Sequence, residues 1–510
     1  MSTNRRDFIK IVVAGAVAAG CPVDLSLLAA AAHESAHVDS ENNTICHQVR
    51  DGLRFNPAPV SKHYDVVIVG GGVSGLTSAY LLKHRNFLLL EKEPHWGGNA
   101  YEMSYDGELY GTGAAFVESP PAADLAKELG LTPLPVNDWD PSIIKGEFVS
   151  DTWGEGLDHL PYPQTVRDAF KKFKQEMLAI DVKARMQELD NTPLSHFLKD
   201  YPQELTDWWT CYCPSNWGTW PAYASALAAV NDVQWFGGEN RQDERSTWPG
   251  GLGAITAKLA EVLAPKYREH MLTGATVVSV VPQDTEVLVT FMQHGQLKTV
   301  AAKGVIMASP KFITSRLVAG IPDEQLEAMH KIRYAPYPVV NLIFDKPVYN
   351  KGYDTWCPGN SFTDFIVADW VIRNQPGYKQ KYNILTFYTP LRENQRNTLL
   401  TEEGARHLAL NVLHDFQKLY SGSDVDPLEV HIYRRGHPMY MVTPGNYTKV
   451  QPLARRPMER VFFANTDSEG PVSTTSTGIE AAHRAVREFE QSLGRNTKRS
   501  AIARAAMVTT

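Results

Sequence analysis

The apolar residues near the start of the chain fall into two short, uninterrupted runs. The run 66–69 leads into the glycine-rich segment 70–75 (GGGVSG), and the run 87–90 ends at Glu91. Runs of this length without polar alternation are typical of strands buried on both faces. The segment 76–82 follows the glycines without a break and favours a helix. The pattern predicts a strand, a glycine turn, a helix and a second strand tipped by a carboxylate.

Each part of this segment suits a bound dinucleotide. Gly70 permits the tight turn, Gly72 lets the backbone approach a pyrophosphate, and Gly75 lets the helix pack closely on the strand. The N–H groups at the helix N-terminus point at the phosphates. Glu91 lies 21 positions after Gly70 (91 − 70), near the spacing of about 20 for an acid that binds ribose. The alternative is an ordinary strand–helix–strand corner whose glycines serve only close packing.

Segments of this type alternate with segments of another character. Apolar residues at helical spacing between 166 and 180 predict an amphipathic helix, and 339–344 is an apolar run typical of a buried strand. We predict an α/β and α+β fold, in which a Rossmann-like domain of interleaved segments adjoins a substrate domain of helices and mixed sheet. The predicted divisions are a leader (1–32), a linker (33–61), nucleotide-binding segments (62–120, 248–312 and 455–490), a helical substrate segment (121–247), a substrate-sheet segment (313–454) and a basic, disordered tail (491–510).

Composition narrows the range of partners. The 510 residues are 43% hydrophobic and 21% charged with a net charge of −7, so nothing indicates nucleic acid as a partner. Five cysteines are too few for a disulfide framework, and there is no CxxCH motif for covalent haem. Cys211 and Cys213 stand one residue apart, which suits neither a redox pair nor a zinc site, so we expect buried thiols and no metal.

The first 32 residues resemble a twin-arginine export signal. Arg5 and Arg6 precede a polar residue, two hydrophobic residues and Lys10, followed by a modest apolar run and small residues at 29–32. The run is too short for a transmembrane anchor. The signal implies export of a folded protein to the periplasm by the twin-arginine (Tat) machinery. The alternatives are lipidation at Cys21 and a disordered start.

Later motifs resemble the flavin-containing amine oxidase and phytoene desaturase superfamily. They are WGGN at 96–99, GTGAAF at 111–116, PGG at 249–251, TVVSV at 276–280, and FFANTD at 462–467 followed by GIEAA at 478–482. The resemblance covers about 62–490 in order and implies bound FAD. It assigns cofactor contacts to Gly70, Gly72, Val73, Ser74, Gly75, Glu91, Lys92, Gly97, Gly98, Asn99, Thr112, Gly113, Ala114, Ala115, Phe116, Val277, Asp467, Gly478 and Ile479.

The resemblance also implies where these contacts lie along the cofactor. Gly97 and Gly98 follow the pyrophosphate and ribitol, and 111–116 lies by the isoalloxazine ring. The backbone of Val277 contacts adenine, and Asp467 binds ribitol or pyrophosphate. The N-terminus of the last helix faces the flavin O2 region, where its dipole favours an anionic reduced flavin.

The sequence departs from the family pattern at three places. Asn99 stands where the family usually has Arg, so one positive charge is lost. The strand 339–342 carries no lysine, which favours a dehydrogenase with another acceptor over an efficient user of oxygen. Gly478 stands where many members have a cage tyrosine before the last helix.

Candidate catalytic residues are aromatic walls and one histidine. An amine dehydrogenase must exclude water and hold a neutral amine beside the flavin, and aromatic rings also attract the cation on approach. The candidates are Trp217, Trp220, Tyr440, Tyr447 and His437. His437 would accept the amine proton near neutral pH. The alternative for each is core packing or structural hydrogen bonding, and this is the favoured interpretation for Trp208 and Trp209.

The resulting functional hypothesis is a periplasmic, FAD-dependent amine dehydrogenase or oxidase of the spermidine dehydrogenase kind. A polyamine substrate also needs a carboxylate for its distal ammonium, and Asp138, Asp140, Glu239 and Asp243 are open candidates. Electrons would pass to a cytochrome, a quinone or oxygen. Two alternatives stay open: a desaturase or isomerase of an apolar lipid such as a carotenoid, and a flavin subunit that only transfers electrons to a partner.

Overall fold

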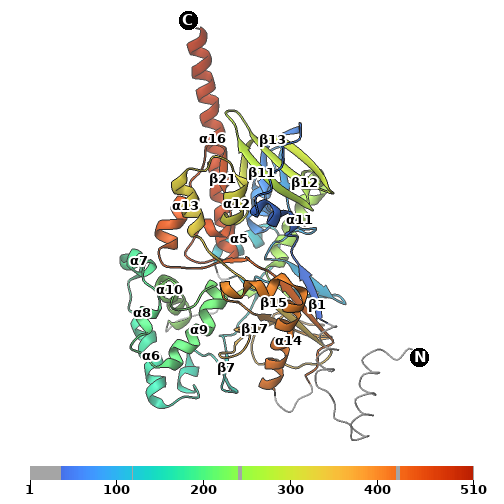
Figure 1. Ribbon diagram of the computed structural model, residues 1–510. Coiled ribbons are helices and arrows are strands. Elements are labelled where there is room, and N and C mark those ends of the chain that lie inside the picture. Colours follow the sequence, from blue (N-terminus) through green and yellow to red (C-terminus); the bar gives the residue numbers. More distant parts are fainter. Residues whose placement is uncertain (1–35, 118, 239–243, 421–424, 509–510) are drawn as a thin grey trace, which may run out of the picture.

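The molecule has two lobes, each built on one large sheet (Figure 1). The computed structural model describes residues 36–117, 119–238, 244–420 and 425–508, with only the backbone described from 495 onward. The predicted leader therefore lies outside the described residues. None of the helices in the described ranges is long and apolar enough to cross a membrane.

The first lobe contains a seven-stranded sheet drawn from three distant parts of the chain. Its order is β10-β3-β2-β13-β12-β11, and β21 pairs with β13. Five strands run parallel, and β11, β12 and β13 form an antiparallel meander. The bounds are β2 (Val60–Val69), β3 (Phe87–Leu90), β10 (Met271–Leu272), β11 (Ala275–Pro282), β12 (Val287–Gln293), β13 (Gln296–Met307) and β21 (Val461–Phe463).

Close packing of helices on this sheet depends on glycine. A Cβ added at Gly75 would lie 1.7 Å from the carbonyl oxygen of Gly70, so a side chain there would force α4 off the turn. The long helix α16 packs on α4 and α5, and α11 also contacts α4. The bounds are α4 (Val73–Leu81), α5 (Pro120–Glu128), α11 (Gly253–Tyr267), α12 (Lys311–Leu317), α13 (Asp323–Lys331) and α16 (Thr475–Val508).

The second lobe contains an eight-stranded mixed sheet in the order β1-β19-β15-β18-β17-β16-β7-β8. Its central strands are buried throughout, because α14 (Glu402–Leu419) packs against it and the cavity described below borders it. The bounds are β1 (Ala36–Ser40), β7 (Ser142–Ile144), β8 (Glu147–Val149), β15 (Val339–Phe344), β16 (Asp354–Trp356), β17 (Asp364–Val367), β18 (Asn383–Tyr388) and β19 (Glu429–Arg434).

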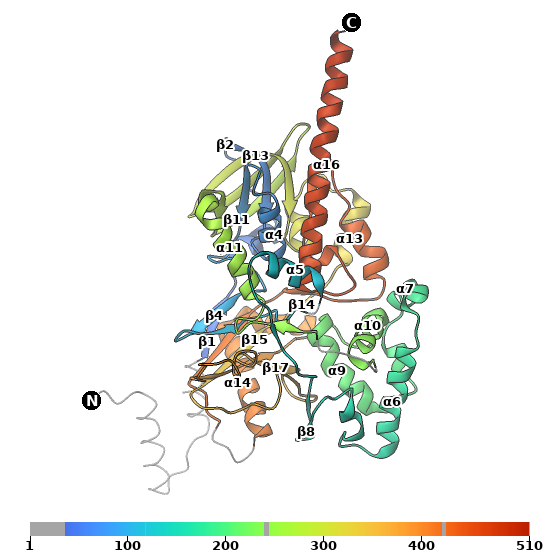
Figure 2. The same ribbon diagram turned by 180° about the vertical axis from the view of Figure 1, so that it is seen from behind.

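A group of helices completes the second lobe (Figure 2). They are α6 (Gln164–Leu178), α7 (Val182–Asp190), α8 (Ser195–Leu198), α9 (Gln203–Trp217) and α10 (Ala226–Gly237). The amphipathic helix expected near 166–180 is α6, whose apolar side chains are buried at the predicted spacing. Trp208 and Trp209 on α9 are core residues, as favoured from the sequence.

Two predicted segments differ from the structure. The expected linker 33–61 contains β1, which pairs in parallel with β19, and helix α3 (Thr44–Arg50). Its polar sequence hid this, because a strand at a sheet edge needs few buried side chains. The expected disordered tail continues α16 to Val508 instead.

Candidate active site

A cavity of about 710 Å³ is lined from both sheets. Its walls include β2 and β11 of the seven-stranded sheet and β15, β16 and β17 of the eight-stranded sheet. This size is typical of sites that enclose a cofactor or ligand. The segments that the sequence assigned to nucleotide binding and the aromatic segments after 208 therefore meet in one space.

The glycine turn forms one wall of this cavity. Gly70, Gly72, Val73 and Ser74 line it, whereas Gly75 is packed behind the turn. Gly70 has φ +112°, a conformation that other residues rarely adopt. Gly72 precedes α4 and has no capping side chain, so the first N–H groups of the helix are free for a ligand.

A second glycine pair lies against the first. The N–H of Gly97 donates to the carbonyl oxygen of Gly71 at 2.9 Å, and both Gly97 and Gly98 have positive φ and line the cavity. A Cβ added at Gly98 would lie 3.1 Å from the Cα of Gly72. Side chains on either segment would fill this part of the cavity, so the two turns form a narrow backbone-lined channel.

Glu91 and its neighbours lie at the same end of the cavity. The carboxylate of Glu91 accepts hydrogen bonds from the N–H groups of Gly71 at 2.5 Å and Glu93 at 2.8 Å. Burial raises the pKa of Glu91. Lys92 lines the cavity and forms an ion pair with Glu93, and Val277 lines it beside an irregularity in β11.

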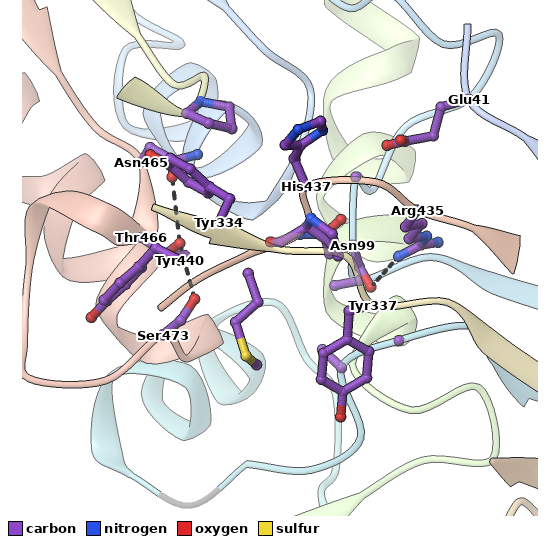
Figure 3. Close-up of a pocket in the computed structure, with 18 of the residues that line it drawn as sticks. Glu41, Asn99, Tyr334, Tyr337, Arg435, His437, Tyr440, Asn465, Thr466 and Ser473 are labelled. Carbon is purple, nitrogen blue, oxygen red and sulfur yellow. Dashed lines mark hydrogen bonds between the residues drawn. The ribbon is translucent and has the colours of Figure 1, made fainter. Parts of the chain in front are cut away.

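Arg435 is a functional candidate that the sequence analysis missed. Its guanidinium lines the cavity and donates to the carbonyl oxygen of Asn99 at 3.1 Å and to Oγ1 of Thr112 at 2.9 Å (Figure 3). Thr112 itself lies behind the wall, whereas Gly113, Ala114, Ala115 and Phe116 line the cavity. The positive charge missing at Asn99 is thus restored by a residue 336 positions later. A pair of arginines next to His437 was the available sequence signal.

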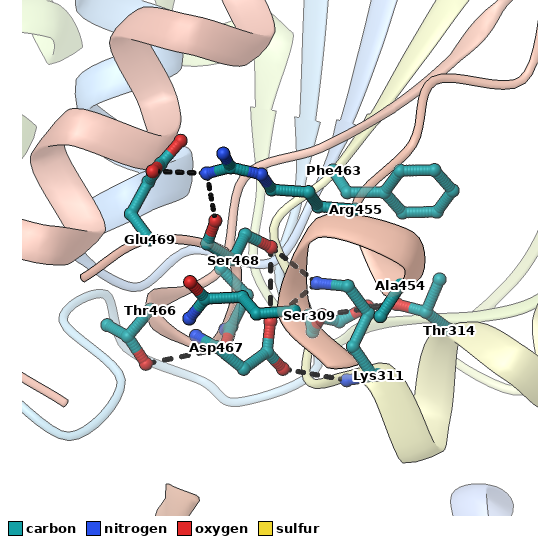
Figure 4. A network of polar contacts seen from close by, with 12 residues as sticks. Ser309, Lys311, Thr314, Ala454, Arg455, Phe463, Thr466, Asp467, Ser468 and Glu469 are labelled. Carbon is teal, nitrogen blue, oxygen red and sulfur yellow. Dashed lines mark hydrogen bonds and ion pairs between the residues drawn. The ribbon is translucent and has the colours of Figure 1, made fainter. Parts of the chain in front are cut away.

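Asp467 does not line the cavity, which differs from the cofactor contact expected for it. Its carboxylate is fully buried and turned toward Lys311, whose Nζ lies 2.5 Å from Oδ1 (Figure 4). The preceding residues Asn465 and Thr466 line the cavity instead. Asp467 lies in a short 3-10 helix (Thr466–Ser468) that follows β21, and its side chain is buried on the interior side.

The last helix begins three residues earlier than expected, at Thr475. Thr475 and the residue before it line the cavity, whereas Gly478 and Ile479 do not. A Cβ at Gly478 would lie 2.9 Å from Val73, so this glycine serves helix packing. Ile479 is a core residue. The helix N-terminus faces the cavity, but Gly478 and Ile479 are not the residues that line it.

Three of the five candidate catalytic residues line the cavity: Trp217, His437 and Tyr440. Trp220 is not among the lining residues and lies under the guanidinium of Arg392, 4.3 Å from the ring centroid. Tyr447 is also outside the wall, on a π-helical turn (Asn446–Val450) that packs on the core. The aromatic wall formed by Trp220 and Tyr447 is therefore not present in this arrangement.

His437 packs against Phe312, with ring centroids 4.7 Å apart and the ring planes tilted by 34°. Burial and the nearby charge of Arg396 lower the pKa of His437 to about 4. The expected titration near neutral pH is thus wrong, because the imidazole is neutral throughout that range. It offers a hydrogen-bonding group and an apolar face rather than an efficient base.

Acidic residues line the cavity where it borders the eight-stranded sheet. Asp354 and Asp364 are buried there beside Ser215 and Tyr337. Two of the carboxylic acids proposed from the sequence lie beside the buried Arg245. Its guanidinium donates hydrogen bonds to the side chain of Asp140 and to the main-chain oxygen of Asp138. Glu239 and Asp243 lie outside the described residues.

Residues 73–488 match the model of a protein family described as flavin containing amine oxidoreductase. The chain belongs to this family. It is an FAD-dependent oxidoreductase, and its predicted mixed α/β fold is confirmed as the fold of this flavin amine oxidoreductase family.

Individual relatives of this flavin amine oxidoreductase are distant but cover most of its length. Oxidoreductase PigB of Serratia is 24% identical over 84% of this chain and 75% of its own length. Flavin-containing amine oxidase B of Cavia porcellus is 25% identical over 84% of this chain and 87% of its own. Among solved structures, a putrescine oxidase bound to putrescine covers 84% of this chain and 99% of its own, at 17% identity and a TM-score of 0.66. Cyclohexylamine oxidase from Brevibacterium oxydans matches with 17% identity, a TM-score of 0.65 and coverage of 84% and 99%. The structural matches show the fold.

The residues of this family member fit FAD. The uncapped N-terminus of α4 and the paired glycine turns suit the pyrophosphate, since they present free backbone N–H groups and little side-chain bulk. Val277 and Glu91 line the cavity and would hold the adenosine part of the cofactor. Residues 113–116 and Arg435 lie where the isoalloxazine and ribitol are expected from the order of the segments.

Proposed function

We propose that this flavin oxidoreductase is a dehydrogenase that oxidises an amine in the part of the cavity bordered by the eight-stranded sheet. The supporting observation is that one cavity joins the FAD-binding turns to a buried wall carrying Trp217, Asp354 and Asp364. Acids and aromatic rings together suit a cationic substrate on entry. Relatives that act on putrescine, cyclohexylamine and other amines support the same substrate class.

The protein supplies position and surroundings, and the cofactor supplies the redox chemistry. When bound, FAD would supply the hydride acceptor for oxidation of the carbon that carries the amine. The chain must hold that carbon close to the ring and exclude water. Trp217 and Tyr440 provide apolar walls, and the neutral imidazole of His437 avoids placing a second cation beside the amine.

The strand beside the flavin position favours an acceptor other than oxygen. Val339 lines the cavity, and Asn341 on the same strand is buried and donates to Oγ1 of Thr386 at 2.7 Å. This strand carries no lysine, the group that the family uses near flavin N5. We therefore propose that a cytochrome or quinone receives the electrons.

Anaerobic titration tests the amine activity. Purified holoenzyme is mixed with a panel of primary amines, secondary amines and diamines, and flavin absorbance is followed. At least one amine should bleach the flavin, and oxidised flavin throughout the panel would refute the proposal. Adding air or a quinone to the reduced enzyme then distinguishes the acceptors, with faster reoxidation expected from the quinone.

We also propose that the mature protein is periplasmic, since the segment 1–32 resembles a twin-arginine signal. The full chain and a variant with Arg5→Lys and Arg6→Lys should be expressed and fractionated. The natural chain should appear outside the cytoplasmic membrane with FAD bound, and the variant should stay inside. Equal distribution of the two would contradict export by this route.

A lipid desaturase would need an apolar chamber at the same place. Asp354 and Asp364 disfavour this alternative, because burying carboxylates against a hydrocarbon chain leaves them without partners. Flavin reduction by a carotenoid but by no amine would reverse the assignment.

A further inference from the structure

Two buried aspartates lie together on the wall formed by β16 and β17. These strands are antiparallel neighbours in which Trp356 pairs with Asp364, and Asp354 is two positions from Trp356. The two acids therefore lie diagonally on one face of the sheet, within reach of each other. They are 4% and 3% exposed, and both line the cavity.

In the described part of the chain, Asp364 accepts hydrogen bonds from neutral hydroxyl groups. Ser215 and Thr363 donate to Oδ1 of Asp364 at 2.7 and 2.5 Å. Oδ1 of Asp354 is buried and has no hydrogen-bond partner in the described part of the chain. A buried acceptor without a partner is costly, so its persistence beside a cavity points to a ligand.

Other charged groups lie near the two aspartates. Asp140 and Arg245 form an ion pair behind the wall, and Asp138 accepts a further hydrogen bond from Arg245 through its main-chain oxygen. Asp232 lines the cavity and accepts a hydrogen bond from Tyr212 at 3.0 Å. Burial is the largest influence on the pKa of Asp354 and holds it well above its usual value. The neighbouring acids raise this pKa further, and Arg245 lowers it.

Aromatic rings enclose the same space. Trp217, Trp356, Tyr337 and Tyr388 line the cavity, and the hydroxyl of Tyr337 lies 2.8 Å from Oγ of Ser215. Figure 3 shows the ring of Tyr337 set apart from the cluster around His437. Asp354 and Asp364 form no ion pair with a cation in the described part of the chain, and aromatic rings enclose them, so this compartment suits a desolvated ammonium group.

We propose that Asp354 and Asp364 bind a second ammonium group of the substrate, so that this enzyme selects diamines or longer polyamines over monoamines of equal length. This inference rests on the proposed amine activity. In the free enzyme the two carboxyls share a proton, as carboxylates in close contact do. An entering ammonium replaces that proton, which is released to solvent.

Matched amines measure the selectivity. Anaerobic stopped-flow reduction of the holoenzyme flavin should be recorded with 1,4-diaminobutane, 1,7-diaminoheptane and the corresponding 1-aminoalkanes. We expect an apparent Kd about 10- to 100-fold lower for the better diamine than for its monoamine, the range for a buried charged hydrogen bond. In D354N and D364N this preference should shrink to about twofold or less, because the apparent Kd of the diamine rises more than that of the monoamine.

Asp369→Asn is the matched control. Asp369 is also a buried aspartate that follows β17, but it pairs with Arg373 and does not line the cavity. This variant should keep the diamine preference. The proposal would be overturned if the unmodified enzyme had the same apparent Kd for diamines and monoamines. It would also be overturned if D354N and D364N changed the apparent Kd of both classes by the same factor.

A binding measurement separates this inference from the proposed activity. Calorimetry of the oxidised holoenzyme with an α,ω-bis-guanidinoalkane, in two buffers of different ionisation enthalpy, reports proton release without turnover. The inference predicts proton release that D364N abolishes, and weaker binding of the mono-guanidinoalkane. If no amine reduces the flavin but the bis-guanidinoalkane still releases a proton on binding, the proposed amine activity is wrong and the dication site is supported. Absence of both proton release and the preference refutes the site.

Discussion

Two buried aspartates in this molecule have opposite surroundings. Asp467 is fully buried, and its carboxylate contacts the ammonium of Lys311, the N–H of Lys311 and the hydroxyl of Tyr334. Asp354 is nearly as buried, but it faces Asp364 and one of its oxygens has no partner in the described residues. The first carboxylate is fully compensated by the protein, and the second is not.

These surroundings distinguish a buried charge that stabilises the fold from one that belongs to a binding site. A compensated buried charge fixes the turn after β21 and needs nothing from outside. An uncompensated pair lowers stability and is kept only where a ligand completes it. The same distinction applies to Arg435, a buried cation whose described hydrogen bonds are to neutral oxygens only. Arg435 and the two aspartates both line the cavity, and the aspartates lie on the wall formed by β16 and β17.

The largest expected effect is at the compensated pair. Asp467→Ala leaves the fully buried Lys311 without its counter-charge, which should cost about 3–5 kcal/mol of unfolding free energy. Urea unfolding with saturating FAD measures this. The double variant Lys311→Met/Asp467→Leu removes both charges and should recover much of the loss. A loss below about 1 kcal/mol in D467A would show that the pair is not compensating a buried charge.

The uncompensated pair should respond in the opposite direction. The pKa of Asp364 is raised to about 7 from an ordinary 3.8 by burial. Between these pH values the folded state binds the proton more tightly than the unfolded state, so stability falls as pH rises from about 4 to about 7. Asp364→Asn should remove about 4 kcal/mol of this fall, because the two pKa values differ by about 3 units and each unit corresponds to about 1.4 kcal/mol.

Thermal unfolding from pH 4 to pH 8 measures this slope. Asp369→Asn breaks an ion pair with Arg373 and should lower stability at every pH without flattening the curve. If stability depended on pH in the same way in D364N and in the unmodified protein, the charge of Asp364 would be compensated by the protein.

Much of the FAD-binding region could be predicted because its determinants are local. Gly70, Gly72 and the start of α4 lie within a few residues of one another, so spacing alone indicates a turn and a helix. Asp467 was misplaced because its partner Lys311 is 156 residues away, and a strand that ends in an acid does not reveal which side the acid faces.

Long-range pairings account for the remaining misses. The polar strand β1 was taken for a linker because its partner β19 lies almost 400 residues later. Arg435 and the Asp354–Asp364 pair escaped for the same reason, since compensation of a charge depends on neighbours in space. Tyr447 was chosen for its type and position, but the π-helical turn directs it away from the cavity.

Arg435 is a buried cation that lines the cavity. Arg435→Gln should weaken FAD binding about tenfold, because one charge-assisted hydrogen bond to an anionic ligand is lost. Fluorescence titration of apoprotein with FAD measures the Kd. Arg373→Gln, which removes a cation outside the cavity, should leave it unchanged. Adding Asn99→Arg to R435Q should restore binding, and failure to do so would separate the two positions.

The smallest effect is expected at His437. Its pKa of about 4 keeps the ring neutral above about pH 5, so His437→Asn should change the rate of flavin reduction by about twofold or less between pH 6 and 9. The pH profile of anaerobic reduction measures this. Loss of an inflection near pH 6.5 in the variant would show that the histidine titrates with substrate and acts as the base.

The interleaved order of the strands has a consequence for how the chain is made. Ala36 pairs with Val430, and Val305 pairs with Val461, so each sheet joins segments from early and late in synthesis. A ribosome must release most of the polypeptide before either lobe closes, and the earliest strand waits for one of the last. Premature stop codons before 461 should therefore yield no half-working fragment, only chains with open sheet edges that invite aggregation.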